Sequence, residues 1–169
     1  APRPYTATWG HEVPSGHDDQ TIENLRAVIT RLFAALGITS GPFDCDIVIS
    51  GGQTYILEMS PRLGGNALSD LARVCAGLDL PDYAVRHALG LPTEIAPSPI
   101  RPAAAVLLGV DTPGALAMNV AAIDELRALD WVVELRLDRA PGDAVLPFIN
   151  GRHRVAAALI TAPDTPTLH

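Results

Sequence analysis

The stretch from Asp46 to Asn66 concentrates the residue types that bind a metal ion and a phosphate group. Two acids, Asp46 and Glu58, are followed by Ser60 and Arg62 and then by a Gly-Gly pair ahead of a predicted helix. Magnesium takes hard oxygen ligands, usually one or two carboxylates together with phosphate oxygens and water. A nearby guanidinium stabilises the negative charge that develops in phosphoryl transfer. The pattern therefore predicts a site for a divalent cation bound to phosphate.

Gly64, Gly65 and Asn66 follow the arginine directly. Glycine lets backbone N–H groups come close to an anion, and the start of a helix attracts negative charge. We therefore expect these three residues, together with Arg62, to bind an anion such as phosphate. The default role of Asn66 is to cap the helix that begins there.

The two acids lie in the arms of a predicted hairpin, residues 42–50 and 53–60, joined by Gly51-Gly52. Side chains alternate between the two faces of a strand. The alternation puts Asp44, Asp46 and Val48 on one face of the first arm, and in the second arm it groups Ile56, Glu58 and Ser60.

The length of the hairpin loop decides whether the acids can share an ion. A two-residue turn at Gly51-Gly52 would pair Asp46 with Leu57, and Asp46 and Glu58 would point to opposite sides of the ribbon. A three-residue loop would place Asp46 opposite Glu58, with Cβ atoms about 5 Å apart. We therefore predict a loop of odd length. A simpler interpretation stays open, in which both acids only point into solvent.

The remaining patterns predict an α+β fold with antiparallel hairpins and flanking helices. Apolar spacing favours helices from Asp18 to Gly37, from Asn66 to Cys75, from Pro81 to Gly90 and over 120–129. Strands are predicted over 103–110 and 131–137, where Trp131 is expected in the core. A second hairpin is predicted over 146–149 and 152–160, around the strong turn signal Asn150-Gly151. Prolines over 92–102 indicate a linker between residues 1–91 and a β-rich lobe, 103–169.

Composition excludes several classes of function. The chain has 169 residues and a net charge of −7, so the basic field that a sequence-independent nucleic-acid binder needs is missing. No apolar run approaches the roughly 20 residues that span a bilayer. All twelve basic residues are arginine, which excludes mechanisms that rely on a lysine of this chain. Cys45 and Cys75 belong to no ligand-spaced cluster, and we expect free thiols in a reducing cytoplasm.

The stretch from Asp46 to Asn66 resembles the metal-and-phosphate segment of the ATP-grasp superfamily, in particular its biotin carboxylase, carbamoyl-phosphate synthase and L-amino-acid ligase branches. That segment has an acid on one strand, Glu-x-Asn-x-Arg at the end of the next strand, and a Gly-rich turn. The resemblance extends from about His11 to Gly90, and more weakly into the tail. It is supported by further matches: Gly41-Pro42-Phe43-Asp44, Ala76-Gly77-Leu78-Asp79-Leu80, Pro141-Gly142-Asp143-Ala144-Val145 and Gly151-Arg152-His153-Arg154-Val155.

The resemblance implies roles for individual residues. Asp46 and Glu58 would be ligands of Mg²⁺ or Mn²⁺, and Arg62 would contact the transferred phosphoryl group of ATP as the catalytic residue. Ser60 stands where the superfamily usually has asparagine, and its hydroxyl would coordinate the metal or hold a bound water. The expected fold is the C-terminal half of an ATP-grasp domain followed by a small β-rich lobe.

The resemblance also implies a reaction and partners. ATP-grasp ligases phosphorylate a carboxylate to an acyl-phosphate, which an amine then attacks. The lysines that grip ATP come from an earlier lobe, so we expect this chain to be a C-terminal fragment or a subunit of a split enzyme, inactive alone. Its partners would be ATP, a carboxylate substrate and that lobe, and the Ala-rich tail is compatible with a homodimer. Two alternatives stay open: a non-catalytic ATP-grasp remnant that acts as a binding or scaffold module, and an unrelated α+β domain.

Overall fold

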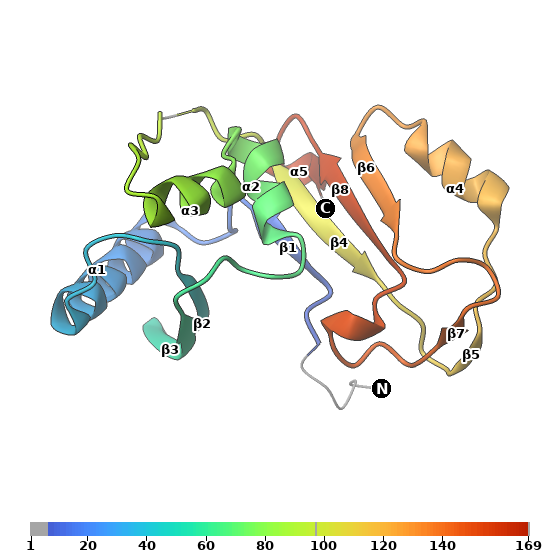
Figure 1. Cartoon of the computed structure of the whole chain (residues 1–169), viewed down its shortest axis with the longest axis horizontal. Helices are drawn as coiled ribbons and strands as arrows, with labels where there is room; N and C mark the ends of the chain where they lie inside the picture. The colour runs from blue at the N-terminus through green and yellow to red at the C-terminus, as the bar shows by residue number, and fades with distance from the viewer. Residues whose placement is uncertain (1–6, 97, 169) are drawn as a thin grey trace. The chain divides into compact units, whose positions relative to one another are not determined.

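The computed structural model describes residues 7–96 and 98–168 (Figure 1). Their contacts form two compact units that interleave along the chain. Of the described residues, the first unit comprises 7–14, 65–78, 96 and 98–168, and the second comprises 15–64 and 79–95. The predicted boundary at residues 92–102 stays a prediction about domain organisation.

The second unit contains two helices and one hairpin. Helix α1 (Asp19–Leu36) is capped by Asp18, whose carboxylate accepts a hydrogen bond from the Thr21 N–H at 2.7 Å. It ends at Gly37, which has a φ of 67° in the left-handed region that glycine tolerates. Helix α3 (Leu80–Ala88) starts with Pro81 in its first turn, as predicted, and Asp79 caps it.

The hairpin of the second unit pairs β2 (Asp44–Ser50) with β3 (Gln53–Ser60) in antiparallel fashion. Its inner face carries half-buried apolar residues and lies against α1, which contacts β3. The Phe33 and Phe43 rings, 5.1 Å apart, fasten the helix to the start of β2. The outer face of the hairpin is exposed at Asp46, Val48, Tyr55 and Glu58.

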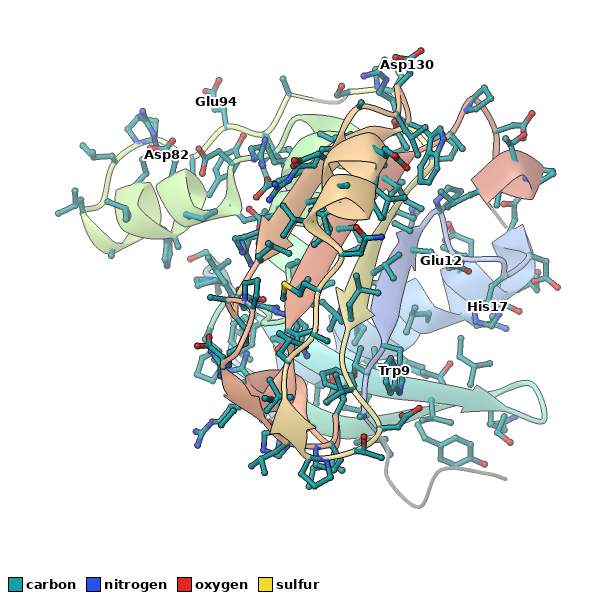
Figure 2. The ribbon with its side chains drawn as sticks, turned by 90° about the vertical axis from the view of Figure 1, so that its right-hand side faces the viewer. Trp9, Glu12, His17, Asp82, Glu94 and Asp130 are labelled. Atoms are coloured by element: carbon teal, nitrogen blue, oxygen red, sulfur yellow. The ribbon has the colours of Figure 1, made fainter. Side chains whose placement is uncertain are left out.

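The first unit is built on a four-stranded antiparallel sheet in the order β1-β4-β8-β6. Its strands are β1 (Gly10–Val13), β4 (Ala103–Leu108), β6 (Val132–Leu137) and β8 (Ala156–Thr161). A second, two-stranded sheet pairs β5 (Gly114–Ala115) with β7 (Ala144–Val145). Helices α2 (Leu68–Ala76) and α4 (Val120–Arg127) lie on opposite faces of the larger sheet (Figures 1 and 2). Two short pieces complete the unit: the 3₁₀ turn η1 (Gly151–His153) and α5 (Thr165–Leu168).

The core of the first unit forms where α2 meets the sheet. Leu71 and Cys75 of α2 pack against Ala103, Ala105 and Leu159, and all five are buried. Alanine at the two β4 positions leaves room for the helix to approach the strand closely, so the small residues of β4 set the depth of the packing. Ion pairs from Arg73 of α2 to Glu134 and from Arg136 of β6 to Asp70 of α2 border this contact.

Two sequence predictions in the first unit are wrong. The predicted hairpin at Asn150-Gly151 is absent, because the Asn150 side chain instead accepts a hydrogen bond from the Arg152 N–H and caps η1. The chain before it turns inward to bury Phe148, whose ring lies 4.4 Å from that of Trp9. Trp131, expected in the core, is 48% exposed at the start of β6.

The predicted α+β class, with antiparallel sheets, flanking helices and a β-rich C-terminal part, is confirmed. None of the helices that the structure describes is both long enough and apolar enough to cross a membrane.

Candidate metal and phosphate site

Asp46 and Glu58 face each other across the hairpin as register partners. The route to this pairing differs from the predicted one. Gly51 and Gly52, with φ of 56° and 74°, close a two-residue turn between Ser50 and Gln53, so the predicted three-residue loop is wrong.

A β-bulge restores the pairing that this turn alone would prevent. Ile47 pairs with Ile56 while Asp46 pairs with Glu58, which leaves Leu57 as the extra residue of β3. The bulge also puts Ile56 and Glu58 on opposite faces of the hairpin, whereas side-chain alternation had predicted that they share a face. Both acids are exposed on the outer face, so the geometric condition for a shared ion is met.

The next pair on the same face of the ladder, two residues away along each strand, is Asp44 and Ser60. The Ser60 hydroxyl donates a hydrogen bond to Glu58 Oε1 at 3.1 Å, which places three oxygen-bearing side chains next to one another on this face. Carboxylate and hydroxyl oxygens are ligands that suit magnesium, and phosphate oxygens with water complete its shell. Among residues 7–96 and 98–168, no three His, Cys, Asp or Glu side chains converge as a ready metal cluster. A cation bound at the acid pair would therefore need further oxygen ligands from outside these side chains.

Arg62 follows Ser60 at the end of the hairpin and bends back over it. Its Nη1 donates to Asp44 Oδ2 at 2.8 Å and to the Leu63 carbonyl at 3.0 Å. The Arg62 N–H also donates to the Ser60 carbonyl at 2.8 Å, which tightens the bend after the strand. Residue spacing singled out Arg62 but missed Asp44, although alternation had placed Asp44 on the face of Asp46.

Electrostatics on the inner face of β2 reflect the two acids beside it. Burial raises the pKa of the Cys45 thiol, and the negative charges of Asp44 and Asp46 raise it further. The Cys45 side chain points to the face opposite that of Asp44 and Asp46. The two charges therefore affect the pKa of the thiol, although the thiol does not lie on the face of the proposed cation site.

Gly64 ends the hairpin segment within the second unit, whereas Gly65 and Asn66 belong to the first. Asn66 and Ala67 both have positive φ, 52° and 67°, a conformation that costs a residue with a Cβ roughly 1–2 kcal/mol. Ala67 occupies the N-cap position of α2 and supplies no side-chain hydrogen bond, so the predicted capping role of Asn66 is wrong. The Asn66 side chain instead lies against Gly151, where an added Cβ would come within 2.5 Å of Asn66 Oδ1.

Comparison with known proteins gives sequence and structural matches. No family model matches the chain. Formate-dependent phosphoribosylglycinamide formyltransferase of Corynebacterium efficiens is 30% identical over 95% of this chain and 40% of its own length. Two solved structures, each 18% identical, have the same fold. L-amino acid ligase from Bacillus licheniformis superposes with a TM-score of 0.85 over 99% of this chain. Phosphoribosylglycinamide synthetase from Anaerococcus prevotii does so with a TM-score of 0.79 over 96%.

This chain spans 40% of the curated relative and 42% of each solved structure. The solved structures are members of the ATP-grasp superfamily. The chain has the fold of the C-terminal part of an ATP-grasp domain, as the sequence motifs predicted. This fold includes the antiparallel hairpin that leads to Arg62, the flanking helices and the β-rich lobe.

Proposed function

We propose that this chain contributes the magnesium and phosphate site of an ATP-dependent ligase that joins a carboxylate to an amine through an acyl-phosphate. The observation that carries the proposal is the pairing of Asp46 with Glu58 across β2 and β3, with Arg62 anchored on the same hairpin. Two acids on one face suit a cation that neutralises phosphate charge, and a guanidinium beside them suits the phosphoryl group in transfer.

Each residue has a defined part in this proposal. Asp46, Glu58 and Ser60 would hold Mg²⁺ or Mn²⁺, which supplies charge neutralisation for the nucleotide phosphates. Arg62 would bind the γ-phosphoryl group as it passes to the substrate carboxylate and would then hold the acyl-phosphate for attack by the amine. Binding and orientation of this kind account for most of the catalysis in phosphoryl transfer.

The backbone after Arg62 would complete the phosphate site. Gly64 and Gly65 carry no side chain that would keep a phosphate away from their N–H groups. Asn66 and Ala67 turn the chain into α2. We assign Gly64, Gly65 and Asn66 to phosphate binding because they follow Arg62 directly in the sequence.

Binding of Mn²⁺ to the purified chain, followed by electron paramagnetic resonance, tests the cation site. We expect D46N and E58Q each to weaken Mn²⁺ binding by more than about tenfold, since even the loss of an outer-shell partner costs a metal site that much. Glu94→Gln is the matched control: Glu94 is an exposed acid in the loop after α3 (Figure 2), and its replacement should leave Mn²⁺ affinity unchanged. Equal affinity in wild type, D46N and E58Q would overturn the proposed site.

The alternative function is a non-catalytic binding module. It is supported by Ser60, which stands where the superfamily usually has asparagine. Both functions predict binding of Mg-ATP, so turnover separates them. The chain mixed with an N-terminal ATP-grasp lobe should hydrolyse ATP in the presence of a carboxylate if it serves a ligase. A binding module would retain ATP without hydrolysing it.

The proposed partners are therefore ATP, a carboxylate substrate and a lobe that supplies the remaining ATP contacts, either in the same protein or as a separate subunit. We also propose a cytoplasmic location, because both cysteines, half-buried Cys45 and buried Cys75, are free thiols.

A further inference from the structure

The guanidinium of Arg62 is held by only one of its nitrogens. Both hydrogen bonds of the side chain, to Asp44 Oδ2 and to the Leu63 carbonyl, are donated by Nη1. This nitrogen carries two hydrogens, so its donors are fully used. Within residues 7–96 and 98–168, Nε and Nη2 have no hydrogen-bond partner. Since the guanidinium is planar and rigid, fixing Nη1 and its two acceptors also fixes where the Nε–Nη2 edge points.

That edge is the part of arginine best suited to an oxyanion. Its two parallel N–H groups match two oxygens of a carboxylate or a phosphate, and such bidentate pairs are among the strongest hydrogen bonds in proteins. The contacts of Arg62 thus leave free the edge that a phosphoryl group or a carboxylate would need.

Asp44 is the fixed member of the ion pair. Its side chain is 19% exposed and projects from β2, where Asp44 is paired with Ser60. The Arg62 side chain is 56% exposed and lies beyond the end of β3. A long, exposed arginine samples many rotamers unless a partner holds it, whereas a short aspartate on a paired strand has few. Asp44 therefore orders Arg62 rather than the reverse.

Asp44 is also placed apart from the acid pair of the proposed cation site. The Asp46–Glu58 pair lies two residues further along the ladder, and the Cys45–Met59 pair stands between the two. A carboxylate already bound by a guanidinium is a poor metal ligand, because the cation must displace the arginine to reach it. The hairpin thus divides its acids into one that holds the arginine and two that remain for a cation.

From this geometry we infer that Asp44 is a positioning residue: it holds Arg62 so that the Nε–Nη2 edge of the guanidinium binds an oxyanion of the substrate, and it does not bind the metal. The inference deepens the proposed function and rests on it. It predicts that Asp44 affects the binding of oxyanions and leaves the binding of cations unchanged.

The test measures two affinities separately, that of tripolyphosphate without metal by calorimetry and that of Mn²⁺ alone by electron paramagnetic resonance. D44N should weaken tripolyphosphate binding about 3- to 10-fold, the size expected from ordering one rotamer-rich side chain. Mn²⁺ affinity should stay within about twofold, because the Asp44 carboxylate is hydrogen-bonded to Arg62 and to none of the proposed cation ligands, so that its loss acts on the cation only as a screened surface charge. D44E keeps the charge and should recover part of the lost affinity.

The direction of the expected change excludes a general charge effect. Replacing Asp44 by asparagine takes the net charge from −7 to −6, which by itself would strengthen the binding of an anion. Asp82→Asn is the matched control, since Asp82 forms an ion pair with Arg86 on α3 at 2.6 Å (Figure 2). This control should leave tripolyphosphate binding equal or slightly stronger.

Two results would overturn the inference. One is that D44N weakens Mn²⁺ as strongly as D46N does, which would make Asp44 a metal ligand. The other is that D44N leaves tripolyphosphate binding unchanged or strengthens it. Failure of the proposed cation site is seen separately, as a wild-type chain that does not bind Mn²⁺, and the tripolyphosphate measurement then still decides the role of Asp44.

Discussion

Asp46 and Glu58 are opposed only because β3 contains one more residue than β2 needs. The turn at Gly51-Gly52 would by itself set Asp46 opposite Leu57, and the bulge moves the register by one position at that point. The acid pair therefore depends on an irregularity of the ladder as much as on the two acids.

Deleting Leu57 should preserve this pair. Without the extra residue, a regular hairpin with the same two-residue turn places Glu58 opposite Asp46 and Ser60 opposite Asp44. The Leu57 side chain is 66% exposed, so its removal costs little packing. We expect Mn²⁺ binding to be retained by the deletion variant. Loss of Mn²⁺ binding with an unchanged far-ultraviolet circular dichroism spectrum would mean that the twist of the bulge itself shapes the site.

Replacing Asp46 by asparagine should make the Cys45 thiol more reactive. The Asp46 carboxylate is one of the charges that raise the pKa of Cys45, so its removal lowers that pKa and increases the thiolate fraction at a given pH. The measurement is the rate of alkylation by iodoacetamide at pH 8, followed for each cysteine by mass spectrometry. Cys75 serves as the internal control, since it is 5% exposed and its pKa is raised by burial alone. An unchanged rate at Cys45 would contradict the prediction.

The Asp138–Arg154 ion pair should make stability depend on pH. Burial acts to raise the pKa of Asp138, but the hydrogen bond and charge of Arg154, together with Arg136, outweigh it and lower the pKa below 3.8. A carboxyl group with a lowered native pKa stabilises the fold above its unfolded pKa and loses that contribution as pH falls through the native value. D138N should therefore cost about 1.5–3 kcal/mol at pH 7.

The cost of D138N should disappear in acid. Urea unfolding of the wild type and D138N at pH 7, 4 and 2 should give a difference in unfolding free energy that shrinks below pH 4. Asp124→Asn, which removes an exposed acid that pairs with Arg127 within α4, should show a smaller difference than D138N at pH 7. A difference that stays constant down to pH 2 would show that Asp138 acts through packing.

A methyl group at position 109 should destabilise the first unit. A Cβ on Gly109 would overlap the Cβ and ring of Phe148, which is 4% exposed against Leu107 and Trp9. Overpacking of this kind costs about 1–3 kcal/mol. The measurement is the thermal unfolding midpoint of Gly109→Ala against Gly16→Ala, where an added Cβ meets nothing within 4 Å. Equal midpoints would show that Phe148 can move aside.

Features that depend on neighbours in the sequence were predictable. The end of α1 at Gly37 and both ends of β3 follow from short-range patterns, and the structure has them where expected. The spacing of Asp46, Glu58 and Arg62 likewise indicated the fold, whereas the roles of these residues in a metal and phosphate site stay a prediction.

Features that depend on contacts between distant parts of the chain could not be predicted from the sequence. Regular alternation of side chains along β3 predicts that Leu57 and Glu58 lie on opposite faces. In the structure both are exposed, because Leu57 is the extra residue of the bulge. Asn150-Gly151 does not form the predicted hairpin turn, because the chain before it turns inward to bury Phe148. The aromatic partner of Phe148 is Trp9, which lies near the other end of the chain. The contact of Asp44 with Arg62 depends on the register that the bulge sets. Side-chain alternation therefore predicted the face on which Asp44 lies, but it did not predict that Arg62 would bind it.

The position of β1 at the edge of the larger sheet has a consequence for synthesis. Gly10 pairs with Val106, so more than half of the chain separates the two strands. During translation β1 leaves the ribosome long before its neighbour exists, and it must stay unpaired until β4 emerges. Closing so large a loop is slow, and we expect the sheet to assemble late, after the hairpin of the second unit has formed from residues close in sequence.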